Sequence, residues 1–292
     1  MRLIKPSFEI WDQEEGLEGI YKQIERAGRV CYKSEDKITE DSAKGFVGRM
    51  VKSGHGAMLE HGTVYLKIPY GTMDDRGEFS NEPIVIKYID NPYSVVMNNS
   101  ENDYWYITSN YRVIIENGWI DDLQYLCEPT EFHAKRITVH FVCDRGVSHE
   151  FVRHRVMSFA QESTRYCNYS KDKFGKECTF IIPSWFNKYM DEDYSNCHTM
   201  NWQDGLDVAD AETNWLYAML FAEKTYFSSL ENGMIAQQAR AVLPNSLKTE
   251  LVMTGFVSDW EHFFKLRDAG SAHPQARELA HPLHEEFKNR TF

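Results

Sequence analysis

ITVHFVCDRG, residues 137–146, places Ile137, Val139 and Phe141 at alternate positions. Successive side chains of a β-strand point to opposite faces of a sheet, so this spacing predicts a strand with one apolar face against a core. A helix is expected to follow Gly146 and to end where the chain becomes basic. The segment therefore predicts a core strand that leads through a helix into a basic segment.

Segments on both sides of this strand carry either the helical or the strand pattern. Helices are predicted where apolar residues recur every three or four positions: residues 14–30, 39–54 with Thr39 as N-cap, 206–231, 234–244, 258–268 and 274–290. Strands are predicted where apolar residues alternate or cluster with aromatic ones: residues 61–69, 83–89, 104–108, 111–116 and 247–257.

The mixture of helices and strands indicates an α+β (mixed α/β) fold. We expect a single domain over residues 1–292, with a central, mostly antiparallel sheet flanked by helices. Residues 70–135 contain several short strand candidates and many Gly, Asn, Asp and Tyr residues. They are therefore expected to be an inserted, strand-rich elaboration within that domain.

The composition disfavours several classes of protein. The net charge is -12 at pH 7, which disfavours binding to nucleic acids or anionic membranes because both are polyanionic. No apolar run reaches the roughly 18 residues of a membrane span, and the N-terminus lacks the apolar region of a signal peptide. The six cysteines include no Cys-x-x-Cys pair, so we expect reduced thiols, no zinc site and a cytoplasmic protein.

One segment departs from this acidic composition. RHRVMSFAQESTRY, residues 153–166, interleaves three arginines and a histidine with hydroxyl side chains. Arginine offers a planar set of donors suited to phosphate oxygens, and the amide of Gln161 suits the edge of a pyrimidine or an isoalloxazine ring. The segment indicates a site for a ligand with phosphate and ring ends. A solvated basic face is the alternative interpretation.

Two arginines and two histidines elsewhere have simpler structural explanations. Arg240 lies in QQARAVLP, where an arginine is commonly a salt-bridge partner, and Arg267 lies at the expected end of a helix, where the helix dipole favours a cation. His55 and His61 are six positions apart, which does not suit one helix face, and no thiol or carboxylate lies at a typical ligand spacing. No metal site is therefore predicted, and His61 better suits a polar contact to a ligand.

Taken together, these segments resemble the flavin-dependent thymidylate synthases. The signature of that family, Arg-His-Arg followed by seven residues and Ser, stands here as RHR at residues 153–155 and Ser163. LEHGTVYL, ARAVLP and FFKLRDAGSAHPQARE resemble further segments of the family in the same order, and GRVCYKS resembles an early loop on the flavin side. The resemblance covers residues 25–285 and is poor over residues 70–135.

The resemblance implies roles for individual residues. Arg267 would be the catalytic residue, facing the uracil ring of dUMP and favouring ionisation at its N3. The other implied dUMP contacts are Glu150, Arg153, Gln161, Glu162, Ser163, Thr164, Arg165 and Arg240, the last from a neighbouring subunit. The implied FAD contacts are His61, Thr63, Arg153, His154, Arg155, Gln161, Ser258, His262 and His273.

The resemblance further implies an FAD-dependent methyltransferase that converts dUMP to dTMP. Methylenetetrahydrofolate would donate the carbon, NADPH would reduce the flavin, and four copies would form a homotetramer with sites at subunit junctions. No protein nucleophile is expected, because none of the cysteines lies in a resembling motif.

The chain also departs from the family at several positions. Some relatives carry other residues at Cys31, Glu150 and Gln161, and some use Asn and Arg for FAD where Phe256 and Ser258 stand here. The adenine end of FAD is therefore expected to be held differently. Three other functions stay open: a nucleotide phosphohydrolase, for which no metal-binding cluster is visible, a nucleotide-binding protein without a flavin, and a flavin enzyme acting on another pyrimidine.

Overall fold

The computed structural model describes residues 1–99, 102–186 and 210–290. Its central sheet has four strands in the order β2 (Ser7–Trp11), β6 (Arg136–Asp144), β9 (Lys248–Phe256) and β7 (Ser158–Gln161), and each neighbouring pair is antiparallel. The long pair β6 and β9 runs from Arg136 opposite Phe256 to Asp144 opposite Lys248. The strands expected at residues 137–146 and 247–257 are confirmed, as is the α+β class with a central antiparallel sheet.

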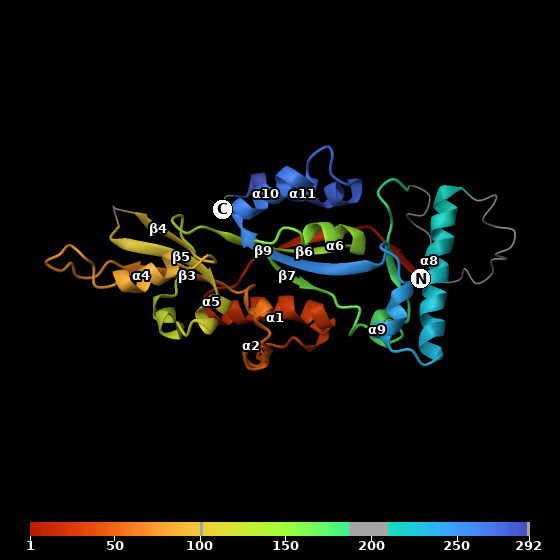
Figure 1. Ribbon diagram of the computed structural model, residues 1–292, viewed down its shortest axis with the longest axis horizontal. Helices are drawn as coiled ribbons and strands as arrows, with labels where there is room; N and C mark the ends of the chain where they lie inside the picture. The colour runs from red at the N-terminus through yellow and green to blue at the C-terminus, as the bar shows by residue number, and fades with distance from the viewer. Residues whose placement is uncertain (100–101, 187–209, 291–292) are drawn as a thin grey trace.

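One face of the central sheet is covered by α6 (Arg145–Phe151), α10 (Val257–Arg267) and α11 (Pro274–Asn289) (Figure 1). The alternating residues Val139 and Phe141 of β6 are fully buried in one cluster with Trp260 and Phe263 of α10. Burying each such side chain contributes roughly 1.5–3 kcal/mol. The Asp144 carboxylate accepts a hydrogen bond from the Val147 N–H at 2.8 Å, which begins α6 directly after the strand.

The opposite face of the sheet packs against α1 (Gly16–Tyr32), the helix expected at residues 14–30. This face mixes apolar contacts with buried polar ones. Thr138 and Thr254 share a hydrogen bond of 2.8 Å between their hydroxyls, and His140 Nε2 lies 3.0 Å from the Glu250 carboxylate. Because the polar groups pair with one another, the face stays buried at little cost.

A second sheet of three antiparallel strands lies at one end of the molecule (Figure 1). Its strand order is β3 (Thr63–Pro69), β5 (Tyr104–Asn110) and β4 (Val95–Asn99). The strands expected at residues 61–69 and 104–108 correspond to β3 and β5. Their inner side chains form a separate core with α1 and with α2 (Ser42–Ser53).

Two strand predictions in the 70–135 segment are wrong, because residues 83–89 and 111–116 form helices. α4 (Glu82–Ile89) has a proline in its first turn and buries Val85 and Tyr88, three positions apart. α5 (Tyr111–Glu116) begins where the Asn110 side chain accepts a hydrogen bond from the Val113 N–H at 3.2 Å. A short apolar run fits a buried strand or a helix equally well by periodicity, and here the proline in the first turn of α4 and the Asn110 cap of α5 favour helices.

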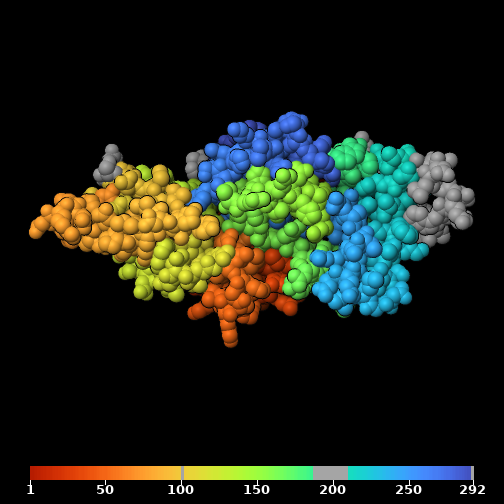
Figure 2. All heavy atoms as spheres, in the orientation of Figure 1, coloured from red at the N-terminus to blue at the C-terminus, as the bar shows by residue number. Residues whose placement is uncertain are grey.

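The remaining elements complete the two ends of the molecule. β1 (Arg2–Ile4) pairs in parallel with β8 (Thr179–Ile181), and both pack near α8 (Ala211–Glu231) and α9 (Ala236–Ala239). The α8 and α9 region forms the end of the molecule opposite the three-stranded sheet (Figure 2). α2 begins at Ser42, three residues after Thr39, the expected N-cap. The Thr39 carbonyl accepts a hydrogen bond from the Ser42 hydroxyl. The shorter helices are α3 (Gly56–Leu59), η1 (Glu35–Lys37), η2 (Ile120–Tyr125), η3 (Asp172–Phe174) and η4 (Arg240–Val242).

Residues 206–209 of the helix expected at 206–231 lie outside the described residues, and its remainder is α8. None of the helices in the described ranges is both long enough and apolar enough to cross a bilayer. The single-domain organisation over residues 1–292 stays a prediction.

Candidate active site

Seven of the sixteen residues expected to contact FAD or dUMP line one open pocket, which we call the arginine pocket. It lies between the end of α6, the following loop and the end of α10, and has a volume of about 550 Å³. The predicted site residues that line it are Glu150, Arg153, His154, Arg155, His262, Arg267 and His273. The strand-to-helix connection after β6 and the length of α10 therefore bring together residues more than a hundred positions apart in the chain.

Arg267 is the most firmly held side chain of the arginine pocket. Its Nη1 donates to the Glu150 carboxylate at 2.6 Å, its Nη2 donates to the Glu150 carbonyl at 2.7 Å, and its Nε donates to His154 Nε2 at 3.1 Å. Burial lowers the pKa of Arg267, Glu150 opposes that shift, and Arg153 adds to it. Three contacts fix the plane of a guanidinium that stays charged, which suits stabilisation of negative charge on a bound ligand.

His154 is buried beneath this arginine and serves as a neutral acceptor. Burial, together with the charges of Arg267 and His262, lowers the pKa of His154 to about 4. Its ring lies 5.0 Å from the Phe263 ring and 5.8 Å from the His262 ring, between centroids. A neutral ring at physiological pH accepts the Arg267 N–H, so His154 orients Arg267 from within the pocket wall.

Arg153 and Arg155 are exposed on the pocket wall. In the part of the chain that the structure describes, neither guanidinium forms an ion pair with a carboxylate. The one carboxylate among the lining residues, Glu150, already binds Arg267. The arginine pocket therefore carries uncompensated positive charge and suits a phosphorylated or otherwise anionic ligand.

A second cluster forms around Arg240, apart from the arginine pocket. Arg240 Nη1 donates to the Thr164 hydroxyl at 3.0 Å, and both residues line a pocket of about 410 Å³ with Arg145. Arg145 is a site candidate that the sequence analysis missed. Its signal was its position, directly after the predicted core strand, where a side chain reaches the edge of the sheet.

The loop after β7 carries the other expected dUMP contacts, and its ends are fixed to the central sheet. Gln161 Nε2 donates to the hydroxyls of Ser148 and Thr249 at 2.9 and 3.2 Å. The Glu162 N–H donates to the Glu250 carbonyl at 2.8 Å, and the Ser163 N–H donates to the Cys31 carbonyl at 3.1 Å. Arg165 is exposed and has its guanidinium carbon 5.4 Å from the centre of the Tyr166 ring.

Glu162 points into a buried cluster of charges and not toward the arginine pocket. Its carboxylate accepts from Lys248 Nζ at 2.8 Å, and Lys248 also pairs with Glu250. Glu250 in turn accepts from Lys33 at 2.7 Å. Burial alone would raise the pKa of Glu250, but the hydrogen bond from His140 and the two lysines hold it well below its usual value. Among the described residues, Glu162 therefore anchors the loop after β7 to β9.

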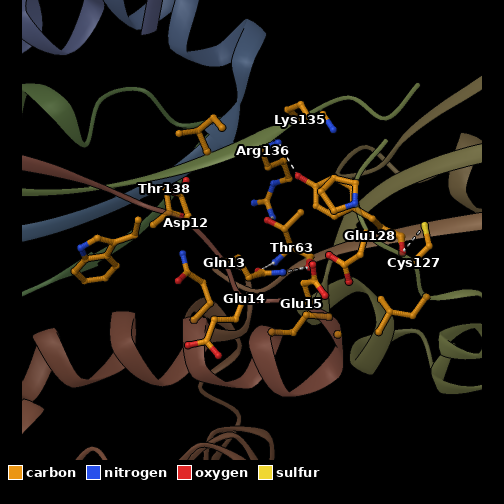
Figure 3. Close-up of a pocket in the computed structure, with 18 residues that line it drawn as sticks. Asp12, Gln13, Glu14, Glu15, Thr63, Cys127, Glu128, Lys135, Arg136 and Thr138 are labelled. Carbon is orange, nitrogen blue, oxygen red and sulfur yellow. Dashed lines mark hydrogen bonds between the residues drawn. The ribbon is translucent and has the colours of Figure 1, made fainter. Parts of the chain in front are cut away.

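Four of the expected FAD contacts lie away from the arginine pocket: Gln161, described above, and three others. His61 is fully buried, with its Nδ1 2.8 Å from the Thr254 hydroxyl, and burial lowers its pKa to about 3. Thr63 lines a different pocket, where its N–H and carbonyl bind the Gln13 side chain (Figure 3). Ser258 is exposed at the start of α10. His61 lies in the turn between α3 and β3, and Thr63 and Ser258 lie at the starts of β3 and α10, positions that residue type alone does not reveal.

Two kinds of chemistry have no support among the described residues. No group of three or more His, Cys, Asp or Glu side chains within residues 1–99, 102–186 and 210–290 is arranged to hold a metal ion. The described cysteines are poor nucleophiles, because burial raises the pKa of Cys167 to about 12 and that of Cys31 to about 11. Cys197 lies outside the described residues.

The fold and the pocket define an α+β protein with an arginine-lined site for anionic ligands. The family model described as thymidylate synthase complementing protein matches residues 87–291. The chain belongs to that family.

Individual relatives agree with this assignment. A flavin-dependent thymidylate synthase of Pyrococcus abyssi is 30% identical over 148 residues, which are 51% of this chain and 52% of the relative. One of Corynebacterium aurimucosum is 25% identical over 278 residues, 92% of this chain and 76% of the relative. The chain thus aligns with about half the length of the Pyrococcus relative.

Among solved structures, a UMP/dUMP methylase, PolB, from Streptomyces cacaoi bound with 5-Br dUMP is similar. The TM-score is 0.43 and the identity 18%, with 99% of this chain and 93% of that chain covered. A likeness of this degree carries no argument about the site.

Proposed function

We propose that the protein is a flavin-dependent thymidylate synthase, which methylates dUMP to dTMP with methylenetetrahydrofolate as carbon donor and NADPH as reductant of FAD. The observation that carries the proposal is the Arg267 guanidinium, fixed on the wall of the arginine pocket by the Glu150 carboxylate, its carbonyl and a neutral His154. Family membership and the names of the relatives support the same reaction.

The donor set of the arginine pocket fits a flavin nucleotide. Arg153 and Arg155 offer exposed guanidinium groups for phosphates, and His262 and His273 line the same wall. Such a cofactor supplies the redox chemistry when bound, while the protein supplies binding and orientation. His61 and Thr63 are not part of this wall, so we propose that Arg153, Arg155, His262 and His273 are the main contacts.

Arg267 has the role of charge stabilisation in this proposal. Carbon 5 of uracil is a weak nucleophile, and negative charge on the ring oxygens and N3 makes it stronger. A fixed guanidinium facing the ring stabilises that charge as it develops. Glu150 and His154 hold Arg267 in place, so both are positioning residues, and no proton needs to leave the arginine.

Arg240, Thr164, Ser163 and Arg165 would bind the phosphate and sugar of dUMP. Arg240 and Thr164 already contact each other within one chain, and Arg145 adds a third group to the same pocket. This cluster and the arginine pocket share no lining residue. We therefore propose that each site of a homotetramer joins the Arg240 cluster of one subunit to the arginine pocket of another.

An absorbance titration tests the proposed function directly. The purified protein, supplied with FAD, should show flavin bands that bleach with NADPH and shift when dUMP is added. Turnover of dUMP with methylenetetrahydrofolate should then be detected as dTMP. A protein that takes up no flavin would overturn the proposal. Flavin binding with turnover of a pyrimidine other than dUMP would support the flavin site and overturn dUMP as the substrate.

A further inference from the structure

Asp268 follows Arg267 at the end of α10 and binds three side chains of α11. His281 Nδ1 lies 2.9 Å from one oxygen of the Asp268 carboxylate, and His284 Nδ1 lies 2.8 Å from the other. Arg277 Nε donates to the Asp268 carbonyl at 3.2 Å and lies 3.4 Å from the carboxylate. We call Asp268, Arg277, His281 and His284 the aspartate cluster. It joins α10 to α11 one residue beyond the arginine that lines the arginine pocket.

The aspartate cluster lies against the apolar core. The Asp268 side chain is only 13% exposed, and the His284 ring stacks on the buried Phe264 ring, with 4.4 Å between centroids and an angle of 8°. Burial by itself would raise the pKa of Asp268, but the hydrogen bonds from His284 and His281 hold it below its usual value. Asp268 is therefore ionised at neutral pH, and each histidine donates a charge-assisted hydrogen bond from Nδ1.

The helix α11 holds the elements that carry both partners of the ion pair between Arg267 and Glu150. Near its start, Gln275 Nε2 donates to the Asp144 carboxylate at 3.0 Å. Asp144 is the N-cap of α6, the helix that carries Glu150. Further along α11, the aspartate cluster holds the end of α10, which carries Arg267. One helix therefore fixes the start of α6 and the end of α10 relative to each other.

The connection from α10 to α11 forms part of the wall of the arginine pocket. Ser271, Ala272 and His273 line the pocket, whereas Asp268, where the connection begins, is not among the described lining residues. The three contacts of Arg267 to Glu150 and His154 orient its guanidinium, and the aspartate cluster fixes the helix that carries it. Asp268 therefore reaches a bound ligand only through Arg267 and the connection.

We propose that Asp268 is a positioning residue for the reaction and fixes Arg267 through the end of α10. This inference rests on the proposed function, since it supports the charge stabilisation given to Arg267. His281 and His284 supply the donors that hold Asp268, so they share this role. A displacement of about 1 Å at a reacting group can lower a rate roughly 10²-fold, and we expect loss of this one carboxylate to lower kcat about tenfold.

A double-mutant cycle on the full-length, flavin-loaded protein tests the role of Asp268. Asp268→Ala should lower kcat for dUMP methylation about tenfold, by displacing Arg267. In the Arg267→Ala background, Asp268→Ala should lower kcat no further, because the residue through which Asp268 acts is absent. Asp268→Asn, which keeps the shape and one acceptor oxygen, should recover part of the loss.

Two variants of His284 separate its donor from its ring. His284→Asn keeps a donor near the position of Nδ1 and loses the stack on Phe264. His284→Phe keeps an aromatic ring on Phe264 and loses the donor. We expect His284→Phe to lower kcat as Asp268→Ala does, and His284→Asn to lower it less. The reverse order would overturn the proposal, since packing of the ring would then be what matters.

Hydrogen–deuterium exchange tests the aspartate cluster without use of the reaction. Asp268→Ala should speed amide exchange over residues 264–272, and the first two turns of α10 should exchange as in the wild type. Glu285→Ala is the control on the same helix, because Glu285 is 52% exposed and pairs with the exposed Lys288 at 2.7 Å. This control should change neither kcat nor exchange.

Each outcome supports or overturns the proposal. A further loss from Asp268→Ala in the Arg267→Ala background would overturn the positioning role, since the effect would then be a general structural one. Unchanged exchange over residues 264–272 would overturn the aspartate cluster as the element that holds α10. If the wild type forms no dTMP but Asp268→Ala speeds this exchange, the cluster stands and the proposed function fails. If Asp268→Ala does not fold, the comparison of His284→Phe with His284→Asn decides.

Discussion

At the scale of single residues, Arg267 has contacts that no other arginine of the described chain combines: a carboxylate, a carbonyl and a neutral imidazole. We expect Arg267→Ala to lower kcat for dUMP methylation roughly 10²-fold, because a charge directed at the developing anion is lost. Steady-state kinetics of the flavin-loaded protein measure this effect.

Cys167→Ala is the matched control for Arg267→Ala. Cys167 lies close to the basic segment, but burial raises the pKa of its thiol to about 12, so it is not a thiolate at neutral pH. We expect this variant to keep substantial turnover. Comparable losses in both variants would contradict a route without a cysteine nucleophile.

His61 makes a prediction about acid stability. Burial lowers its pKa to about 3, whereas an unfolded histidine titrates near 6.5. As the pH falls below about 6.5, the unfolded chain binds a proton that the folded chain does not, so stability is lost until about pH 3, by up to about 1.4 kcal/mol per pH unit. Urea denaturation between pH 7 and 4.5 should show a shallower pH dependence for His61→Asn than for the wild type. The exposed His149, changed to Gln, should leave the dependence as it is.

At the scale of elements, the buried charge cluster on β9 ties the loop after β7 to the sheet. Lys248 and Glu162 have side chains only 15% and 1% exposed. Lys248→Met would leave Glu162 as an unpaired buried charge, and we expect a loss of about 3–5 kcal/mol in the free energy of unfolding. Urea denaturation followed by circular dichroism measures the change.

A surface pair provides the comparison for this element. Lys22 and Glu14 are 41% and 67% exposed, so Lys22→Met should cost no more than about 1 kcal/mol. The double variant Lys248→Met with Glu162→Gln should recover part of the lost stability, since the uncompensated charge is gone. Equal effects of Lys248→Met and Lys22→Met would show that the cluster does not stabilise the loop.

At the scale of the whole molecule, the proposed site is divided between two places. Arg240 lies beside α8 and α9 at one end, and Arg267 ends α10 over the central sheet (Figure 1). If subunits combine these halves, Arg240→Ala and Arg267→Ala should each have strongly reduced activity alone, and subunits mixed by co-expression should regain a fraction of the wild-type activity. Each mixed oligomer then contains some sites with both arginines intact.

Two measurements accompany the mixing experiment. Sedimentation of the wild type should give a mass of four chains, and the mixed sample should have the same mass. Mixed oligomers without activity would contradict a site shared between subunits. A pair of variants within the arginine pocket, Arg267→Ala with Glu150→Ala, is the control, because no mixture of those two restores a complete pocket.

The sequence by itself determined the parts of the protein where a local pattern has one physical solution. The alternation in β6 and β9 and the long apolar periodicity of α1 and α11 lead to the same elements in the structure, because burial of an apolar face is required for each. The Arg-His-Arg segment indicated a candidate site, since arginine in such a pattern suits phosphates, whereas Arg240 and Arg267 were added to it only by the family resemblance.

Only the tertiary structure decided what depends on neighbours distant in the chain. Residues 83–89 and 111–116 form helices, favoured by Pro83 in the first turn of α4 and by the Asn110 cap of α5, although their composition allows strands. His61 became a buried core group and Glu162 an anchor, because the sheet brings Thr254 and Lys248 against them. The environment of Arg136 is likewise a tertiary property, because its hydrogen bonds to the Glu60 carbonyl and the Thr63 hydroxyl join segments distant in the chain, which no local spacing encodes.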